Sequence, residues 1–232
     1  MTAAARACLV DVYDTIFRSV FVERVTAVAE SLGVSVGDWL VELEKTRLDR
    51  DRGKLTTAAA YDQALRSLGI EPADGQVDDL MRRDAEFSRT HTRLFDDTVP
   101  FFQWLRAEGI LIALVSNCAD TTRGLLESLG VIPLVDAVVL SCEVGSAKPS
   151  PEIYVTALAD LGVAAADAVF IDDQPTFCLG AEAVGVRPIQ ITRDGATAVD
   201  AINAINGATI PAGPAGWDFP VVRSLLDAKP LL

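Results

Sequence analysis

The sequence predicts an α/β protein, in which a Rossmann-like parallel sheet carries helices on both faces and is interrupted once by a helical insertion. Short apolar runs of strand length alternate with amphipathic helical segments in the second half of the chain. Between residues 20 and 92 the segments have helical periodicity and no convincing strand occurs. Strands separated by helices at this spacing predict right-handed βαβ crossovers and a parallel sheet covered on both faces. We therefore expect a core formed by residues 1–17 and 96–232, with a helical domain inserted at 18–95.

The individual elements are expected where the apolar pattern changes its period and where glycine or proline interrupts it. Buried strands are expected at residues 7–13, 110–115, 137–140, 168–171 and 188–191. Helices are expected at 20–32, 38–47, 57–68, 77–89, 100–108, 121–129, 151–161 and 177–184. In the third of these, Thr57 is expected as the cap and Gly69 as the stop signal. A loop rich in glycine and proline at 207–216 should lead into a short last element near 221–226.

The composition limits the classes of partner. The 232 residues carry a formal net charge of −13, which argues against nucleic acid or an anionic membrane as a partner. A small phosphorylated substrate stays compatible, because a local pocket can oppose the overall charge. No apolar run approaches the roughly 20 residues that span a bilayer, and the first residues lack the pattern of a signal peptide. We therefore expect a cytoplasmic protein, whose oligomeric state has no signal in the sequence.

Carboxylates, lysine and hydroxyls are the main residues available for chemistry. Cys8, Cys118, Cys142 and Cys178 have no metal-ligand spacing and are expected to be free thiols in a reducing compartment. His91 is the only histidine, which argues against a Ser-His-Asp triad and against a zinc site with several histidines. Catalysis, if present, must therefore depend on acidic residues, lysine, serine and threonine.

Polar residues follow four of the expected strands. In an open parallel sheet, ligands bind at the carboxyl ends of the strands, so these residues are the candidate site. A single Asp or Ser at the end of a strand is more often a turn or cap residue, but the combination in this order is far more specific. The residues, in chain order, are Asp11, Tyr13, Asp14, Thr15, Ser116, Asn117, Lys148, Asp172 and Asp173.

These four segments resemble the four motifs of the haloacid dehalogenase superfamily. They read CLVDVYDT, ALVSN, AKPSPEIY and VFIDD, and the resemblance covers nearly the whole chain. The helical insertion lies between the first and second motifs, where one type of cap domain is found in this family. The resemblance implies a HAD-like core with a helical cap, and a hydrolase that acts through a covalent intermediate.

The resemblance also implies a role for each matching residue. Asp11 would be the nucleophile, acting together with Lys148 and Ser116. Thr15, Asn117 and Tyr13 would contact the substrate. The ligands of a Mg²⁺ ion would be Asp11, the main-chain carbonyl of Tyr13, Asp172 and Asp173.

Elementary chemistry agrees with these roles. A carboxylate nucleophile divides hydrolysis into two easier steps through an acyl-type intermediate. Several carboxylates that converge on one site repel each other and cannot all stay ionised unless a cation joins them. Mg²⁺ suits such a set because it is a hard ion that takes oxygen ligands and commonly lies beside substrate phosphate.

The residue two positions after Asp11 and the fourth motif favour different activities. Phosphatases of this family usually have a second Asp there as general acid, whereas Tyr13 resembles the haloacid dehalogenases proper, which have a neutral fourth motif and need no metal. Burying Asp172 and Asp173 beside Asp11 without a cation would be costly. We therefore favour a Mg²⁺-dependent phosphatase that acts on a small phosphorylated metabolite through an aspartyl-phosphate. The alternatives are a metal-free 2-haloacid dehalogenase and a non-catalytic member that binds a ligand or partner.

Other polar and aromatic residues are expected to be structural. Asp14 is expected as a turn residue that tolerates left-handed backbone. His91 is expected to be a structural histidine, and Trp39 and Phe87 to lie in the core of the insertion. Three arginines of the insertion are expected on a solvated helix face, with contact to a substrate anion as the alternative: Arg47, Arg50 and Arg52.

Overall fold

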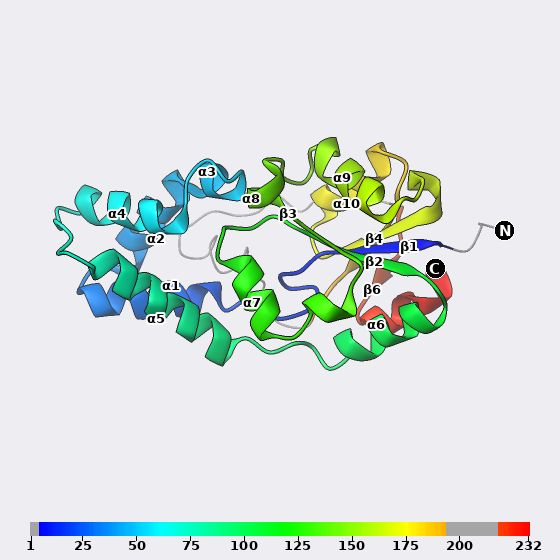
Figure 1. Ribbon diagram of the computed structural model, residues 1–232, viewed down its shortest axis with the longest axis horizontal. Coiled ribbons are helices and arrows are strands. Elements are labelled where there is room, and N and C mark those ends of the chain that lie inside the picture. Colours follow the sequence, from blue (N-terminus) through cyan, green and yellow to red (C-terminus); the bar gives the residue numbers. More distant parts are fainter. Residues whose placement is uncertain (1–4, 194–217) are drawn as a thin grey trace.

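A six-stranded parallel sheet forms the core of the molecule (Figure 1). The computed structural model describes residues 5–193 and 218–232, so the expected loop at 207–216 lies outside the described residues. The strands are β1 (Ala7–Val10), β2 (Leu111–Ser116), β3 (Ala137–Leu140), β4 (Ala168–Asp172), β5 (Arg187–Ile191) and β6 (Val221–Val222). Their order in the sheet is β3-β2-β1-β4-β5-β6, which places β1 at the centre between β2 and β4.

Helices cover both faces of this sheet, as the alternating pattern predicts. The helices of the core are α6 (Thr98–Ala107), α7 (Thr122–Ser128), α8 (Ser141–Val144), α9 (Pro151–Leu161) and α10 (Pro175–Ala183). Three short 3-10 helices accompany them: η1 (Ile132–Leu134), η2 (Ala165–Asp167) and η3 (Leu225–Leu231). Along β1, Cys8 and Val10 pack in the hydrophobic cluster that contains residues of α6, whereas Ala7 and Leu9 pack in the cluster that contains residues of α9. Both faces of the strand are buried, which explains its unbroken apolar run.

The inserted helices form a helical lobe at the end of the molecule opposite the two termini (Figure 1). They are α1 (Phe21–Leu32), α2 (Val36–Lys45), α3 (Arg47–Asp51), α4 (Thr57–Ser67) and α5 (Gln76–His91). The lobe has its own hydrophobic cluster, in which the Trp39 and Tyr61 rings meet edge to face at 5.2 Å. The expectation for Trp39 is therefore confirmed. The expectation for Phe87 is wrong, because Phe87 is only half-buried and stacks on the exposed ring of His91 at 3.9 Å.

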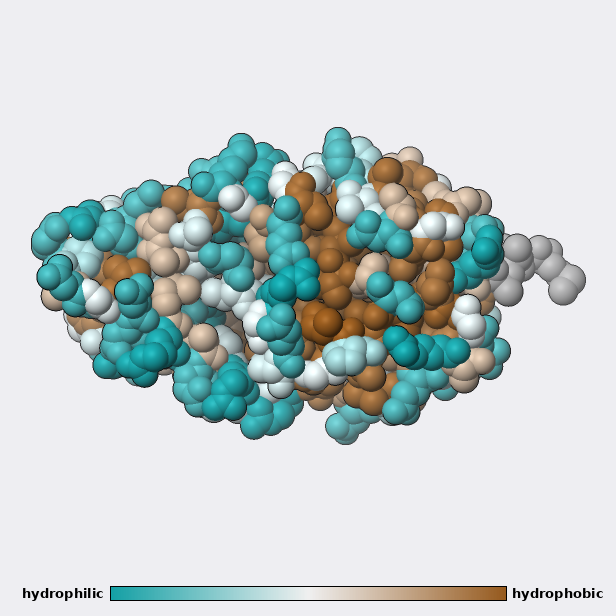
Figure 2. All heavy atoms as spheres, in the orientation of Figure 1, coloured by the Kyte–Doolittle hydropathy of each residue, from teal (hydrophilic) through white to brown (hydrophobic). Residues whose placement is uncertain are grey.

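The surface of the two parts differs in polarity. Figure 2 shows mostly hydrophilic residues over the helical lobe and a hydrophobic area over the part of the sheet that contains β2 and β3. The edge strand β3 contributes to this area, since Ala137 and Val138 are only half-buried. No helix within residues 5–193 or 218–232 combines the length and the apolar character needed to cross a membrane.

The first strand is shorter than expected, because the chain turns as soon as it leaves the sheet. The strand ends at Val10, although the Asp11 amide still donates to the Ile171 carbonyl at 2.9 Å. Asp14 then takes a left-handed conformation, with φ at 57°, and its carboxylate accepts a hydrogen bond from the Ser19 amide at 2.8 Å. The interpretation of Asp14 as a turn residue is confirmed.

The helix starts within the lobe also differ from expectation by one or two residues. α2 begins at Val36 because the Ser35 hydroxyl accepts from the Asp38 amide at 3.0 Å. The cap of α4 is Thr56 and not Thr57, since the Thr56 hydroxyl accepts from the Ala59 amide. Near the C-terminus, the expected short element at 221–226 is divided between β6 and η3.

Two segments connect the helical lobe to the core, and they pair with each other. Phe17 and Leu94 form an antiparallel bridge, and the Phe95 amide donates to the Ile16 carbonyl at 3.0 Å. The Thr98 hydroxyl donates to the same carbonyl at 2.8 Å. The chain thus leaves the core and returns to it at one place.

The lobe contacts the core a second time through the start of α4. The Thr57 amide donates to the Asp120 carboxylate at 3.1 Å, and the Thr57 hydroxyl donates to the same carboxylate. Beside this contact, Gly53 packs so closely on the Cys142 carbonyl oxygen that a Cβ there would lie 1.9 Å from it. Gly53 also has a φ of 66°, a conformation that favours glycine.

We expect Gly53→Ala to destabilise the protein more than Gly69→Ala. Both glycines have positive φ, so each substitution costs about 1–2 kcal/mol for the left-handed backbone. Only Gly53→Ala adds a clash with main chain, worth about another 1–3 kcal/mol, because nothing lies within 4 Å of the Cβ position at Gly69. Urea unfolding of both variants measures the difference. Equal free energies of unfolding would show that the lobe moves away from Cys142 at no cost.

Candidate active site

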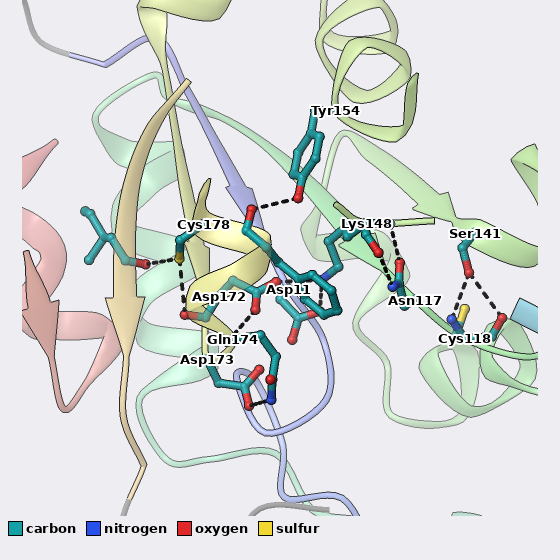
Figure 3. A network of polar contacts seen from close by, with 12 residues as sticks. Asp11, Asn117, Cys118, Ser141, Lys148, Tyr154, Asp172, Asp173, Gln174 and Cys178 are labelled. Carbon is teal, nitrogen blue, oxygen red and sulfur yellow. Dashed lines mark hydrogen bonds and ion pairs between the residues drawn. The ribbon is translucent and has the colours of Figure 1, made fainter. Parts of the chain in front are cut away.

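The candidate residues converge at the carboxyl end of the sheet because β1, β2 and β4 end side by side. Val10 pairs in register with Leu114 on one side and with Ile171 on the other. The residues that follow these strands therefore meet at one edge of the sheet, as Figure 3 shows for Asp11, Asn117, Asp172 and Asp173.

Lys148 lies between two of the strand-end acids. Its Nζ donates to Asp11 Oδ1 at 2.5 Å and to Asp172 Oδ2 at 2.6 Å (Figure 3). The ammonium also faces the rings of Phe170 and Phe177, with 5.4 and 4.9 Å between Nζ and the ring centroids. Burial opposes the charge on Lys148, but the two carboxylates outweigh it and hold the pKa of the ammonium above its usual value. Lys148 is therefore a fixed positive charge.

Asn117 holds the main chain of Lys148 in place. Its Oδ1 accepts from the Lys148 amide at 2.7 Å, and its Nδ2 donates to the Lys148 carbonyl at 2.8 Å. The sequence predicts contact between Asn117 and the substrate. In the structure, both the oxygen and the nitrogen of the Asn117 side chain are hydrogen-bonded to the main chain of Lys148. Gly180 packs behind the same loop, where a Cβ would lie 2.8 Å from the Pro149 carbonyl oxygen.

Three carboxylates at this edge are close enough to share a cation. Oxygen atoms of Asp11, Asp172 and Asp173 lie within 4.8 Å of one another. Asp172 and Asp173 accept from the main-chain and side-chain nitrogens of Gln174 at 2.7 and 2.9 Å. Burial raises the pKa of Asp172 to about 7, and burial together with the charge of Asp172 raises the pKa of Asp173. Lys148 alone does not balance three negative charges, so the donor set fits a divalent cation such as Mg²⁺.

Two buried hydroxyls near the acids have no hydrogen-bond partner. Thr15 Oγ1 and Ser116 Oγ belong to side chains that are at most 1% exposed, and neither makes a hydrogen bond in the structure. Leaving a buried hydroxyl unpaired costs free energy, so both atoms are available to a ligand. Thr15, Ser116 and Asp172 are buried and do not line the cavity described next.

A cavity of about 600 Å³ separates this edge of the sheet from the helical lobe. Of the residues expected at the site, those that line it are Asp11, Tyr13, Asp14, Asn117, Lys148 and Asp173. The lobe contributes residues of α1, α2, α3 and α5 to its walls. The structure thus brings the strand-end acids and the insertion to one cavity.

Tyr13 forms part of the cavity wall. Its hydroxyl hydrogen-bonds with Thr122 Oγ1 at 2.8 Å, and its ring meets that of Phe17 edge to face at 5.0 Å. Burial raises the pKa of the Tyr13 phenol above its usual value. The side chain is therefore neutral and turned towards α7.

Arg24 and Asp84 form an ion pair that lines the cavity and that the sequence did not predict. Arg24 Nη1 donates to Asp84 Oδ2 at 2.6 Å, and the Asp84 side chain is only 2% exposed. The residues are 60 positions apart, so no local pattern connects them. One signal was present, because Asp84 lies four residues after the buried Leu80, on the core-facing side of its helix.

The arginines of the insertion differ from one another. Arg47 is exposed and pairs with Glu44 and Asp51, as a solvated helix face predicts, and Arg52 is also exposed. The expectation for Arg50 is wrong, because Arg50 is buried and its Nη2 donates to the Leu43 carbonyl at 3.0 Å. Its guanidinium therefore stabilises the lobe.

Comparison with known proteins identifies the class. The family model of the haloacid dehalogenase-like hydrolases matches residues 5–185. The chain therefore belongs to this family. Its helices and parallel sheet have the fold of this family, as the four motifs predict.

Two of the similar curated proteins are phosphatases. A phosphatase of Mycobacterium tuberculosis is 30% identical over 105 residues, which are 44% of this chain and 48% of the relative. A phosphoserine phosphatase of Thermus thermophilus is 30% identical over 53% of this chain and 51% of the relative. The chain spans about half the length of these curated relatives.

Solved structures share the fold over nearly the full length. A HAD phosphatase from Thermococcus onnurineus has a TM-score of 0.65 at 20% identity, with 97% of both chains covered. The L-2-haloacid dehalogenase from Xanthobacter autotrophicus with covalently bound chloropropionic acid has a TM-score of 0.67 at 21% identity, with 98% of both chains covered. Phosphatases and dehalogenases thus share this fold, and the side chains of the site must distinguish them.

We expect Mg²⁺ to stabilise the protein more at pH 8 than at pH 5.5. The folded-state pKa of Asp172, raised from 3.8 to about 7, makes the folded chain hold a proton that the unfolded chain releases. This contribution to stability is complete below about pH 4 and is lost as the pH rises through 7. Above pH 7 a bound cation replaces the proton, and at ten times its Kd it adds about 1.4 kcal/mol.

Thermal unfolding with and without millimolar Mg²⁺ at the two pH values measures this effect. Asp173→Asn should remove most of the Mg²⁺ response, whereas Asp96→Asn, the same change at an exposed position, should keep it. An equal response to Mg²⁺ at both pH values would contradict the assignment of the acid cluster as a cation site.

Proposed function

We propose that the chain is a Mg²⁺-dependent phosphatase that acts on a small phosphorylated metabolite. The observation that carries this proposal is the cluster of Asp11, Asp172 and Asp173 beside the buried ammonium of Lys148. A metal-free reaction has no use for the two additional acids, one fully buried and one half-buried, whose charge is costly without a cation. The similarity to curated phosphatases supports the same conclusion.

Asp11 is the nucleophile in this proposal. A carboxylate oxygen of Asp11 bonds to phosphorus while the bond from phosphorus to the substrate oxygen breaks, which forms an aspartyl-phosphate and releases the dephosphorylated product. Water then attacks phosphorus, the bond to Asp11 breaks, and the electron pair returns to the carboxylate as inorganic phosphate forms. Each step is easier than direct attack of water on the ester.

The surrounding residues hold the phosphoryl group in both steps. Lys148 supplies a fixed positive charge to the phosphoryl oxygens, and Asn117 positions it through its main chain. The unpartnered hydroxyls of Thr15 and Ser116 are available as donors to the same oxygens. Asp11, Asp172, Asp173 and the Tyr13 carbonyl would hold Mg²⁺, which supplies charge neutralisation beside the phosphate.

The helical lobe acts as the cap over this site. Residues 18–95 form one wall of the cavity and meet the core through the paired connecting segments and through Thr57 and Asp120. Exclusion of bulk water by such a cap strengthens the electrostatic contacts with the phosphoryl group. The cavity of about 600 Å³ leaves room for a substrate body beyond phosphate.

A 2-haloacid dehalogenase is the second candidate, and Tyr13 is the observation that favours it. In that case Asp11 would form a carboxylate ester with the substrate and the reaction would need no metal. The metal requirement separates the two activities. A screen of phosphorylated metabolites and of 2-haloacids, each with Mg²⁺ and with a chelator, tests both candidates at once.

We expect Asp11→Asn to abolish turnover while the fold is retained. Asparagine is nearly isosteric with aspartate but cannot form the phosphorylated intermediate. Steady-state rates on an aryl phosphate and a far-ultraviolet circular dichroism spectrum measure the two properties. Asp96→Asn is the matched control, because it makes the same change at an exposed position. More than a tenth of the parent activity in Asp11→Asn would rule out Asp11 as nucleophile.

We expect the rate to depend steeply on the pKa of the leaving group. The neutral Tyr13 side chain takes the place of the general acid and is hydrogen-bonded to Thr122, so alkyl phosphates, whose departing oxygen needs a proton, should be poor substrates. Aryl and acyl phosphates leave as stable anions and should be cleaved. Tyr13→Asp should raise the rate on alkyl phosphates by up to about 10²-fold with little effect on aryl phosphates.

A Brønsted series on the parent and the variants measures this dependence. Tyr13→Phe is the control, since it adds no acid and should leave the ratio of the alkyl to the aryl rate as in the parent. A flat dependence in the parent would mean that another group already protonates the leaving group. Asp14, which also lines the cavity, would be the first candidate for this acid.

A further inference from the structure

Two cysteines occupy equivalent positions beyond neighbouring strands. Ser116 at the end of β2 pairs in register with Leu140 at the end of β3, and Cys118 and Cys142 each follow two residues later. Ser141, the first residue of α8, connects this helix to the segment that follows β2. Its Oγ accepts from the Cys118 amide at 2.9 Å and donates to the Cys118 carbonyl at 3.3 Å (Figure 3). The side chains of Cys118 and Cys142 also pack in the same hydrophobic cluster. The two cysteines are therefore neighbours in space.

The two thiols differ in their surroundings. Cys118 is only 4% exposed and lies in the wall of the active-site cavity, whereas Cys142 is half-buried. The neighbouring Cys118 thiol lowers the pKa of Cys142, which favours its thiolate, the form that reacts with oxidants. Cys8 and Cys178 are fully buried, and burial raises the pKa of both thiols. One reactive thiol with a second thiol beside it is the arrangement that forms a disulfide after oxidation.

We propose that Cys118 and Cys142 form a reversible disulfide when the protein meets a peroxide, and that this disulfide inhibits the active site. The Cys142 thiolate attacks one oxygen of the peroxide, the O–O bond breaks, and a sulfenic acid forms with release of water or an alcohol. The sulfur of Cys118 then attacks the Cys142 sulfur and releases water. The two thiols lose two electrons, which reduce the peroxide, and a dithiol reductant reverses the change.

Inhibition follows from what lies next to Cys118. Formation of the bond draws the two sulfur atoms to about 2.05 Å from each other, which is well inside their contact distance as free thiols. Cys118 directly follows Asn117, which holds Lys148 against Asp11. A displacement of about 1 Å at a catalytic group can cost about 10²-fold in rate, so we expect a loss of at least about tenfold. This part of the inference depends on the proposed function.

Peptide mapping tests the disulfide without any assay of activity. The reduced full-length protein is treated with a few equivalents of hydrogen peroxide, alkylated, and digested with trypsin and a glutamate-specific protease. Each cysteine then falls in its own peptide, with Cys118 in 109–123 and Cys142 in 128–143. We expect these two peptides to be cross-linked in most molecules and to separate after dithiothreitol. Alkylation of both thiols, pairing with Cys8 or Cys178, or oxidation of Cys142 to sulfinic acid without a cross-link would overturn the proposal.

Activity on an aryl phosphate tests the inhibition. Peroxide should lower the parent rate at least tenfold, and dithiothreitol should restore it. Cys142→Ser should have the parent rate and resist peroxide, whereas Cys8→Ala should still form the cross-link. A parent that keeps full activity with the cross-link complete would overturn the inhibitory role. A reduced parent without any phosphatase activity would instead count against the proposed function, and the mapping would still decide whether the disulfide forms.

Discussion

The ammonium of Lys148, buried between the carboxylates of Asp11 and Asp172, is the interaction on which the arrangement of the site depends. The ion pair connects the ends of two adjacent strands, β1 and β4, to the loop that precedes α9. Without the lysine the two carboxylates would repel each other at the sheet edge. Charges out of water are costly unless they are paired and hydrogen-bonded, and here Gln174 supplies a further donor to Asp172. The contacts that hold the loop of Lys148 in place, including the side-chain amide of Asn117 and the close packing of Gly180, therefore determine the surroundings of Asp11, the proposed nucleophile.

Much of this arrangement could be predicted from the sequence, because in a parallel sheet the residue that follows each strand lies at the same edge. The positions of the strands along the chain therefore indicate which side chains meet. Buried strands have continuous apolar runs, which locate their carboxyl ends in the sequence. Residues 11, 116, 148 and 172 follow such runs, so the sequence alone predicts that they lie together. The structure agrees for Asp11, Lys148 and Asp172, whereas Ser116 is buried and does not line the cavity.

What could not be predicted depends on contacts between distant segments. The Arg24–Asp84 pair joins two helices of the lobe across 60 residues, and an acid on a polar-looking helix is ordinarily exposed. Arg50 was expected in solvent because its neighbours are charged, but its position places it over the Leu43 carbonyl. The apolar run predicted a strand to Tyr13, but the strand ends at Val10, and the hydrogen bond from Ser19 to Asp14 that holds the following turn is not specified by composition. Two local signals were present, the spacing of Asp84 from Leu80 and the preference of Asp14 for turns.

The pairing of the two segments that enter and leave the helical lobe has a consequence for how such an enzyme can diversify. Since Phe17 and Leu94 are bridged, the ends of the inserted stretch are adjacent whatever the stretch between them contains. The entropy of closing that stretch varies only with the logarithm of its length, so lengthening, shortening or replacing it changes the cost of closure little. The sheet and the acids at its carboxyl edge keep their connectivity through any such exchange. The inserted lobe can therefore be replaced as a unit, and a core of this kind can acquire a different cap at a single point of attachment.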